Sequence, residues 1–107
     1  MEKEDYVQQA WQYEAKGRYL TAHGSFDKAS ELDPDNVDYK FYAATMIFRH
    51  ALQTPFEKAF IIHETDYLEW AKKLFLAILE THPDHKLAQK HVGYCNKHIL
   101  RIKALKP

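Results

Sequence analysis

The chain has 107 residues, which is the length of one ordinary domain. Hydrophobic residues make up 46% of it and aromatic residues 14%, so the chain can bury a core and is not a disordered segment. The 15 basic and 15 acidic residues cancel, which argues against a non-specific attraction to DNA or to membranes. Only three Gly and four Pro are present, which favours long helices over many short strands.

The charges are unevenly distributed along the chain. Residues 1–38 contain nine acidic and four basic residues, whereas six Lys or Arg and no acidic residue follow Asp84. The single cysteine, Cys95, excludes an internal disulfide and makes a reducing, cytoplasmic location the expectation. The chain opens with no basic-then-apolar leader and has no apolar run of about 18 residues, so we expect neither a signal peptide nor a membrane span.

Residues 3–36 carry small and aromatic residues at fixed intervals. The second half of this segment has the pattern Ala22-x3-Phe26-x2-Ala29-x4-Pro34. These steps place Ala22, Phe26 and Ala29 on one face of a helix, with Pro34 just beyond its end. The small residues let a neighbouring helix approach closely, and the proline stops the helix and directs the chain into the next one.

The same intervals return later in the chain. The pattern Ala71-x3-Phe75-x2-Ile78-x4-Pro83 repeats the first one 49 residues further on. Self-similarity of this kind is the signature of stacked helical hairpins. We therefore predict an all-α fold built from consecutive antiparallel hairpins.

The first segment resembles the tetratricopeptide repeat (TPR) family. The family pattern of small, aromatic, Gly, aromatic, Ala, Phe, Ala and Pro residues is matched by Ala10, Tyr13, Gly17, Tyr19, Ala22, Phe26, Ala29 and Pro34. The segment departs from the family at Tyr6, where a Trp is usual, and at Gln9, where a Leu is common. The resemblance implies a single domain with a right-handed, TPR-like stack of hairpins. It also implies a non-enzymatic protein–protein interaction module, such as an adaptor, co-chaperone or scaffold.

The second hairpin is longer than the family repeat. TPRs repeat about every 34 residues, whereas Pro34 and Pro83 are 49 residues apart, so about fifteen residues are inserted. We assign repeat one to 3–36 and repeat two to 37–83. The insertion falls at about 54–66, as a short helix followed by a turn at Glu64-Thr65.

The sequence leaves two registers open for repeat two. In the first, 37–53 is the first helix of the repeat, because Ala44 then aligns with Ala10. In the alternative register, 55–63 is the repeat's own first helix and 37–53 is the insertion.

A last helix is predicted at about 84–104, with Gly93 at the small position of a third first helix. Stacked repeats leave an apolar face open at each end, so we expect this helix to cap the stack with a polar outer side. Five basic residues supply that side: Lys86, Lys90, Lys97, Arg101 and Lys103. The apolar stripe expected to face repeat two consists of Val92, Ile99, Ile102 and Leu105.

The resemblance also implies where a partner binds. In TPR folds the first helix of each repeat lines the concave side, and exposed aromatic clusters usually mark binding surfaces. The expected peptide-binding residues are Trp11, Phe41, Tyr42, Thr45, Phe48, Arg49, Lys90 and Tyr94. We therefore expect the partner to be a protein or peptide that offers an apolar or amphipathic segment. The alternative is that an insertion helix with Phe56, Phe60 and Ile61 covers some of these aromatic residues.

Two histidine-containing segments offer potential metal ligands. His91-x3-Cys95-x2-His98 places three potential zinc ligands on one helical face, but no fourth ligand is evident. We interpret Cys95 as a buried packing residue and both histidines as partly exposed ones. The segment His82-Pro83-Asp84-His85 is interpreted as a turn that caps the next helix. We expect no metal and no other cofactor.

An enzyme is not expected, because the sequence has no nucleophile motif, no phosphate-binding glycine loop and no His-Glu-x-x-His. The basic last helix offers an alternative function, which is to bind nucleic acid or an anionic membrane surface. We prefer its capping role, because an uncapped repeat stack would be insoluble, and we expect no nucleic-acid partner.

Overall fold

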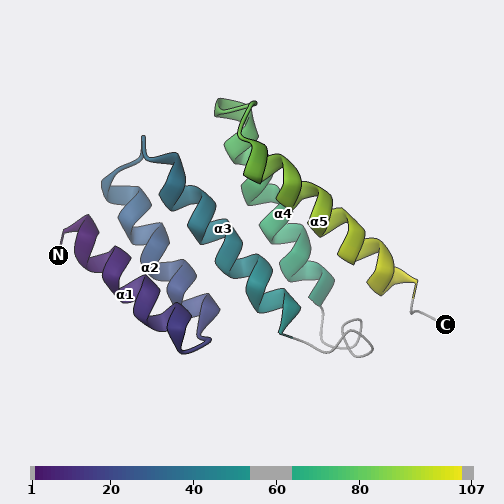
Figure 1. Cartoon of the computed structure of the whole chain (residues 1–107), viewed down its shortest axis with the longest axis horizontal. Coiled ribbons are helices and arrows are strands. Elements are labelled where there is room, and N and C mark those ends of the chain that lie inside the picture. The colour runs from purple at the N-terminus through teal and green to yellow at the C-terminus, as the bar shows by residue number, and fades with distance from the viewer. Residues whose placement is uncertain (1, 54–63, 105–107) are drawn as a thin grey trace.

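The structure, a computed structural model, describes residues 2–53 and 64–104 (Figure 1). These residues form five helices with loops between them: α1 (Lys3–Ala15), α2 (Tyr19–Leu32), α3 (Val37–Leu52), α4 (Glu64–Thr81) and α5 (Lys86–Lys103). No strand occurs among them. The predicted all-α fold is therefore confirmed for the described part of the chain.

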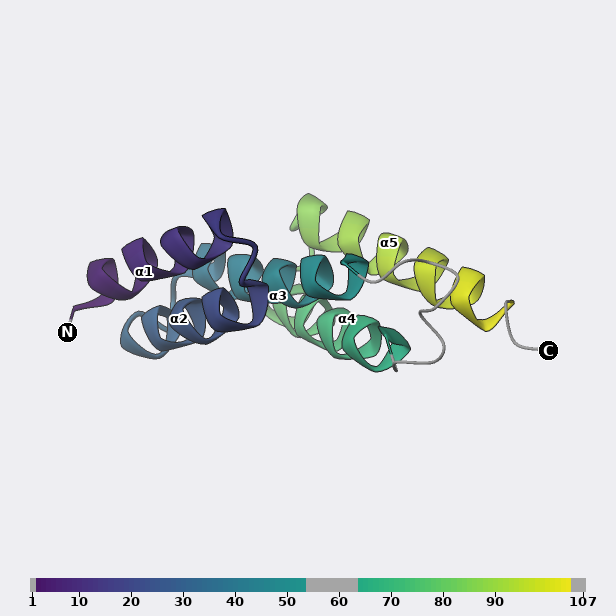
Figure 2. The same ribbon diagram turned by 90° about the horizontal axis from the view of Figure 1, so that it is seen from below.

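The helices pack in the order in which they occur in the sequence. Each helix contacts the next one along the chain, and neighbouring helices run in opposite directions (Figure 1). Seen from below, α1, α3 and α5 form one layer, and α2 and α4 form the other (Figure 2). The molecule is a stack of helical hairpins, in which α1–α2 and α3–α4 are paired and α5 closes the row.

Helix α3 packs between α2 and α4, so residues 37–52 form part of the stack of helices. The predicted extra helix at 55–63 lies outside the described residues. The predicted turn at Glu64-Thr65 is wrong, because α4 already begins at Glu64. Asp66 therefore lies in the first turn of α4, where an acidic residue interacts favourably with the helix dipole.

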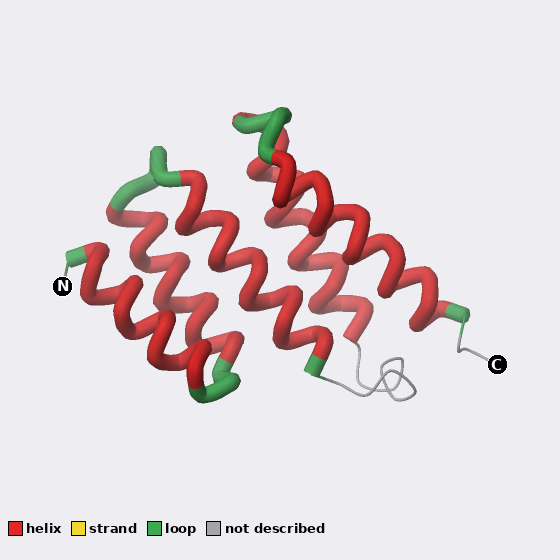
Figure 3. The backbone as a smooth tube through the Cα atoms, viewed as in Figure 1, coloured by secondary structure: helices red, strands yellow, loops and turns green. Residues whose placement is uncertain are grey.

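Short loops with specific residues connect the other helices (Figure 3). Gly17 lies in the middle of the first loop and has a φ of 73°, a backbone conformation that glycine adopts without strain. Asn36 caps α3, and its side chain accepts a hydrogen bond of 3.0 Å from the backbone N–H of Asp38. His85 caps α5, because its Nδ1 accepts from the backbone N–H of Ala88 at 3.0 Å. The interpretation of the second histidine segment as a cap is confirmed.

The repeated sequence pattern coincides with the core. All six helical residues of the two copies are buried: Ala22, Phe26, Ala29, Ala71, Phe75 and Ile78. Such close contact depends on the small residues, since a larger side chain would push the neighbouring helix away. The sequence pattern therefore predicted the core of both hairpins.

Within the described ranges, the core consists of two clusters that share α3. Ala10, Ala22, Phe26, Ala43 and Met46 form the cluster between α1, α2 and α3. A larger cluster joins α3, α4 and α5, and α5 contributes four buried residues to it: Ala88, Cys95, Ile99 and Ile102. The predicted apolar stripe of the last helix is confirmed for Ile99 and Ile102, which are buried, and for Val92, which packs against this cluster. Leu105 lies outside the described residues.

Candidate functional site

A row of aromatic rings crosses the layer formed by α1, α3 and α5. The rings of Trp11 and Tyr42 lie 5.3 Å apart, and Tyr42 lies 6.2 Å from Phe41. Phe41 then contacts His91 at 5.2 Å, and His91 contacts Tyr94 at 5.4 Å. We call these five side chains the aromatic row, and the side of the molecule that carries them the first-helix face. Four of the eight predicted site residues thus lie in one continuous set of contacts.

The ends of the aromatic row are open to solvent. Trp11 is 41% exposed and Tyr94 is 47% exposed, whereas the central Phe41 and Tyr42 are half-buried. The indole of Trp11 also packs edge-on against buried Phe26, with ring centroids 4.9 Å apart. The row is therefore fixed by the core below it, and its outer rings keep apolar surface that a partner can cover.

Phe48 corrects one part of the predicted site. It was expected to face a partner, but it is only 7% exposed and belongs to the core. Its ring contacts His91 at 5.5 Å and His98 at 6.0 Å, so α5 covers it. The prediction failed because the sequence alone did not show that α5 lies against this side of α3.

Arg49 holds the two hairpins together at the edge of the first-helix face. Its guanidinium donates to the Glu14 carboxylate at 3.0 Å and to the Tyr19 hydroxyl at 3.0 Å. The guanidinium also stacks over the Tyr19 ring, 4.5 Å from its centroid. Next to it, the side chain of Gln53 donates to the carbonyl of Gly17 at 3.0 Å. Arg49 therefore already has partners within the chain, which tie α3 to α1 and α2.

The last two predicted site residues, Thr45 and Lys90, differ in their exposure to solvent. The Thr45 hydroxyl donates to the Phe41 carbonyl within α3 at 2.8 Å, and the residue is half-buried. Lys90 is exposed and lies one helical turn before Tyr94 on α5. A cation thus stands beside the exposed end of the aromatic row.

Two exposed leucines on this side were not predicted from the sequence. Leu52 lies one turn after Phe48 on α3, and Leu87 lies one turn before His91 on α5; both are exposed. Leu52 also lines a small hollow of about 230 Å³ with Tyr19, Arg49 and Gln53. The four-residue spacing from Phe48 and His91 is the signal that would have found them.

Burial shifts the pKa of both Cys95 and His98. Burial raises the pKa of the Cys95 thiol to about 12, so the thiolate does not form at neutral pH. Burial also lowers the pKa of His98, and the nearby charges of Arg101 and Lys97 lower it further. Cys95 is a fully buried packing residue and His91 and His98 are half-buried, as predicted. Among the described residues, no group of three or more His, Cys, Asp or Glu is placed to hold a metal ion.

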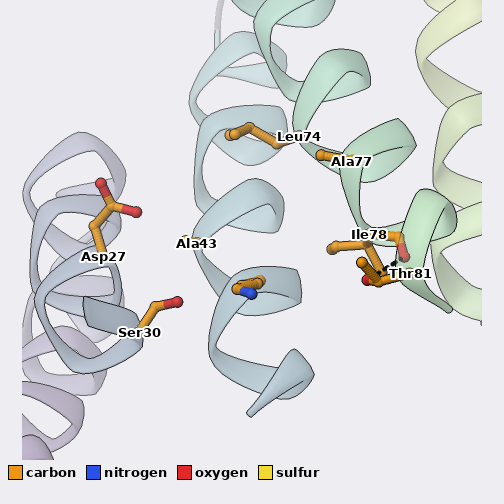
Figure 4. Close-up of a pocket in the computed structure, with 8 residues that line it drawn as sticks. Asp27, Ser30, Ala43, Leu74, Ala77, Ile78 and Thr81 are labelled. Atoms are coloured by element: carbon orange, nitrogen blue, oxygen red, sulfur yellow. Dashed lines mark hydrogen bonds between the residues drawn. The ribbon is translucent and has the colours of Figure 1, made fainter. Parts of the chain in front are cut away.

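The opposite side of the molecule has a hollow of its own. It lies between α2, α3 and α4 and has a volume of about 300 Å³ (Figure 4). Asp27 and Ser30 line it from α2, and Leu74, Ala77 and Thr81 line it from α4. No role was predicted from the sequence for this side, which we call the second-helix face.

The second-helix face also carries an exposed aromatic side chain. Trp70 of α4 is 41% exposed, and its ring lies 5.1 Å from that of His23 on α2. It is therefore as exposed as Trp11 but lies in the other layer, so each face of the molecule has one partly exposed tryptophan.

The fold defines this chain as an all-α stack of helical hairpins. No helix among the described residues has both the length and the hydropathy to cross a membrane. Comparisons with family models, with curated proteins and with solved structures found no match to the chain.

Proposed function

We propose that this chain is a TPR-like, non-enzymatic protein-interaction module that binds an apolar or amphipathic peptide segment on its first-helix face. The observation that supports this function is the aromatic row, which runs across α1, α3 and α5 and is exposed at both ends. Aromatic side chains are frequent anchors of binding because they offer a large contact area at a small entropic cost.

The chemistry of the face defines the segment that fits it. Trp11 and Tyr94 offer apolar ring surface at the two ends, and Leu87 extends that surface on α5. Lys90 places a positive charge beside Tyr94, while Arg49 is already paired with Glu14. The proposed segment therefore has apolar residues that contact the rings and an acidic residue that meets Lys90.

The class and location of the protein are part of the same proposal. The TPR-like pattern of residues 3–36, the stack of hairpins and the buried repeat positions support the class. The single, buried Cys95 fits a reducing, cytoplasmic location. Adaptor, co-chaperone and scaffold roles all use a surface of this kind.

The experiment is a selection of peptides from a random display library on the immobilised protein. We expect selected peptides to be rich in apolar residues and to bind the Trp11→Ala variant about thirtyfold more weakly, as loss of an anchor of 2 kcal/mol implies. Trp70→Ala is the matched control, because it removes an equally exposed tryptophan from the other face. Equal binding by the wild type and Trp11→Ala would refute the proposal.

The salt dependence of binding separates this function from the alternative. All five predicted basic residues of α5 are exposed, so an anionic partner could contact them: Lys86, Lys90, Lys97, Arg101 and Lys103. Binding to nucleic acid or to an anionic membrane would weaken steeply between low and high salt. We expect peptide binding on the first-helix face to change little with salt.

A further inference from the structure

One side of α5 is exposed, whereas α1 and α3 bury the equivalent side in the core. Ala10 of α1 and Ala44 of α3 hold equivalent positions and are fully buried in the two core clusters. Gly93 holds the same position in α5, 49 residues after Ala44, but it is exposed. A Cβ added to Gly93 would meet no neighbouring group within 4 Å. The small position is therefore present in α5, and none of the helices that the structure describes packs on it.

The same comparison applies two turns further along. Ala51 of α3 is buried in the cluster that α3 forms with α4 and α5. Its equivalent in α5 is Leu100, which is 68% exposed. A wholly polar outer side was expected for α5 from the sequence. Exposed Leu100 shows that this side is partly apolar. We call the side formed by Gln89, Gly93, Asn96 and Leu100 the open face of α5.

The molecule itself shows what packs on such a face. In each hairpin, the equivalent side of the first helix is covered by a helix with the repeated stripe of small and aromatic residues. In α4 this stripe is Ala71, Phe75 and Ile78, all of them buried. Gly93 lacks even the methyl group of Ala44, so it allows a helix to approach at least as closely as α4 approaches α3. The open face therefore fits an amphipathic helix.

The charges around the open face restrict which helix can bind. Exposed Lys97 lies one turn from both Gly93 and Leu100, and exposed Lys103 lies one turn from Leu100. The sequence of α5 contains no Asp or Glu that would neutralise them. A helix with acidic residues beside its apolar stripe is complementary to this surface, whereas a second α5 would bring like charges together.

We propose that the open face of α5 binds an acidic amphipathic helix from a partner protein, which packs on α5 as α4 packs on α3. This interaction would complete a third hairpin. It uses the side of α5 that carries Gly93 and Leu100, and not the side that carries Tyr94 and His91. It is therefore independent of peptide binding on the first-helix face.

The test uses a defined helical peptide. The probe is a fluorescent peptide with the sequence of residues 64–81, in which the lysines at 72 and 73 are changed to glutamate. We expect the full chain to bind it, and the Leu100→Lys variant to bind it at least about tenfold more weakly. A second variant, Gly93→Leu, should bind as weakly because its side chain fills the contact. Both variants should fold, since both positions are exposed.

Two controls separate the possible outcomes. The peptide that keeps both lysines should bind at least about tenfold more weakly than the probe, and Trp11→Ala should bind the probe as the wild type does. Equal binding by the wild type and Leu100→Lys, or no binding of the probe, would overturn the proposal. Loss of binding in Trp11→Ala would place the probe on the first-helix face and would also overturn it.

Sedimentation of the protein alone tests whether a second copy of this chain occupies the open face. A dimer that the Leu100→Lys substitution dissociates would overturn the proposal of a partner protein and would identify a second copy as the occupant.

Discussion

Trp11 of α1 and Tyr42 of α3 lie edge to face, with ring centroids 5.3 Å apart and an interplanar angle of 63°. The pair links the first helices of the two hairpins, and Trp11 continues inward to Phe26 in the core. A ring that is anchored on one side and 41% exposed is already held in place before a partner arrives. Binding then costs little side-chain entropy, which is the physical basis of the proposed function.

The helix contacts at the repeated small residues can be tested by overpacking. Ala22 and Ala71 are both fully buried where helices meet. We expect Ala22→Leu and Ala71→Leu each to lower the free energy of unfolding by about 1–3 kcal/mol, because the added atoms force the helices apart. Urea unfolding followed by circular dichroism measures the change. Wild-type stability in both variants would contradict the packing described here.

The contacts of Arg49 predict a loss of stability, although this residue was expected to bind a partner. Arg49→Met keeps the aliphatic part of the side chain but removes its bonds to Glu14 and Tyr19. We expect the free energy of unfolding to fall by about 1 kcal/mol, since the ion pair is partly exposed and the hydrogen bond to Tyr19 and the contact with its ring add modestly to it. A double-mutant cycle with Glu14→Gln isolates the pair. A coupling energy of zero would show that the pair does not stabilise the stack.

Most of the fold could be predicted because the sequence repeats itself. The intervals between Ala22, Phe26 and Ala29 return at Ala71, Phe75 and Ile78, and helical spacing turns each set into one buried face. The proline that follows each set marks the end of its helix. The start of α4 could not be predicted in the same way, because the segment before it has no counterpart in the first repeat.

The candidate site was predicted less completely, for a physical reason. Position on a helix tells which residues share a side, but not which neighbour covers them. Trp11 and Phe48 both looked available, yet α5 covers Phe48 and leaves Trp11 exposed. Leu100 shows the converse, because the outer side of the last helix was expected to be polar, yet this leucine is exposed there. Such differences depend on contacts between helices far apart in the sequence.

The thiol of Cys95 provides a chemical test of the α4–α5 packing. It is fully buried, and its pKa is raised to about 12 by burial. We expect iodoacetamide to leave Cys95 unmodified in the native protein at a pH of about 8 and to alkylate it rapidly in urea. Intact-mass spectrometry follows the reaction. Rapid alkylation of the native protein would mean that this side of α5 is not packed against α4.

The environment of His98 predicts a pH dependence of stability. Its pKa in the folded state lies below its ordinary value of 6.5, because burial and then the charges of Arg101 and Lys97 disfavour the protonated form. The unfolded state therefore binds the proton first as the pH falls. The stability that this residue contributes is present above pH 6.5 and is lost as the pH falls through the folded pKa. We expect His98→Gln to lose less stability than the wild type between about pH 7.5 and pH 5, measured by urea unfolding. Equal losses would contradict this explanation.

The central claim is that the first-helix face, and not the second-helix face, captures the partner segment. The chain has two tryptophans, and the structure places Trp11 on the first face and Trp70 on the second, each 41% exposed. Titration of the ¹⁵N-labelled protein with a selected apolar peptide reports on both indole N–H signals in one spectrum. The account predicts that the Trp11 signal shifts in a saturable way while the Trp70 signal stays in place. A shift of the Trp70 signal alone would contradict the account and would place the peptide on the second-helix face.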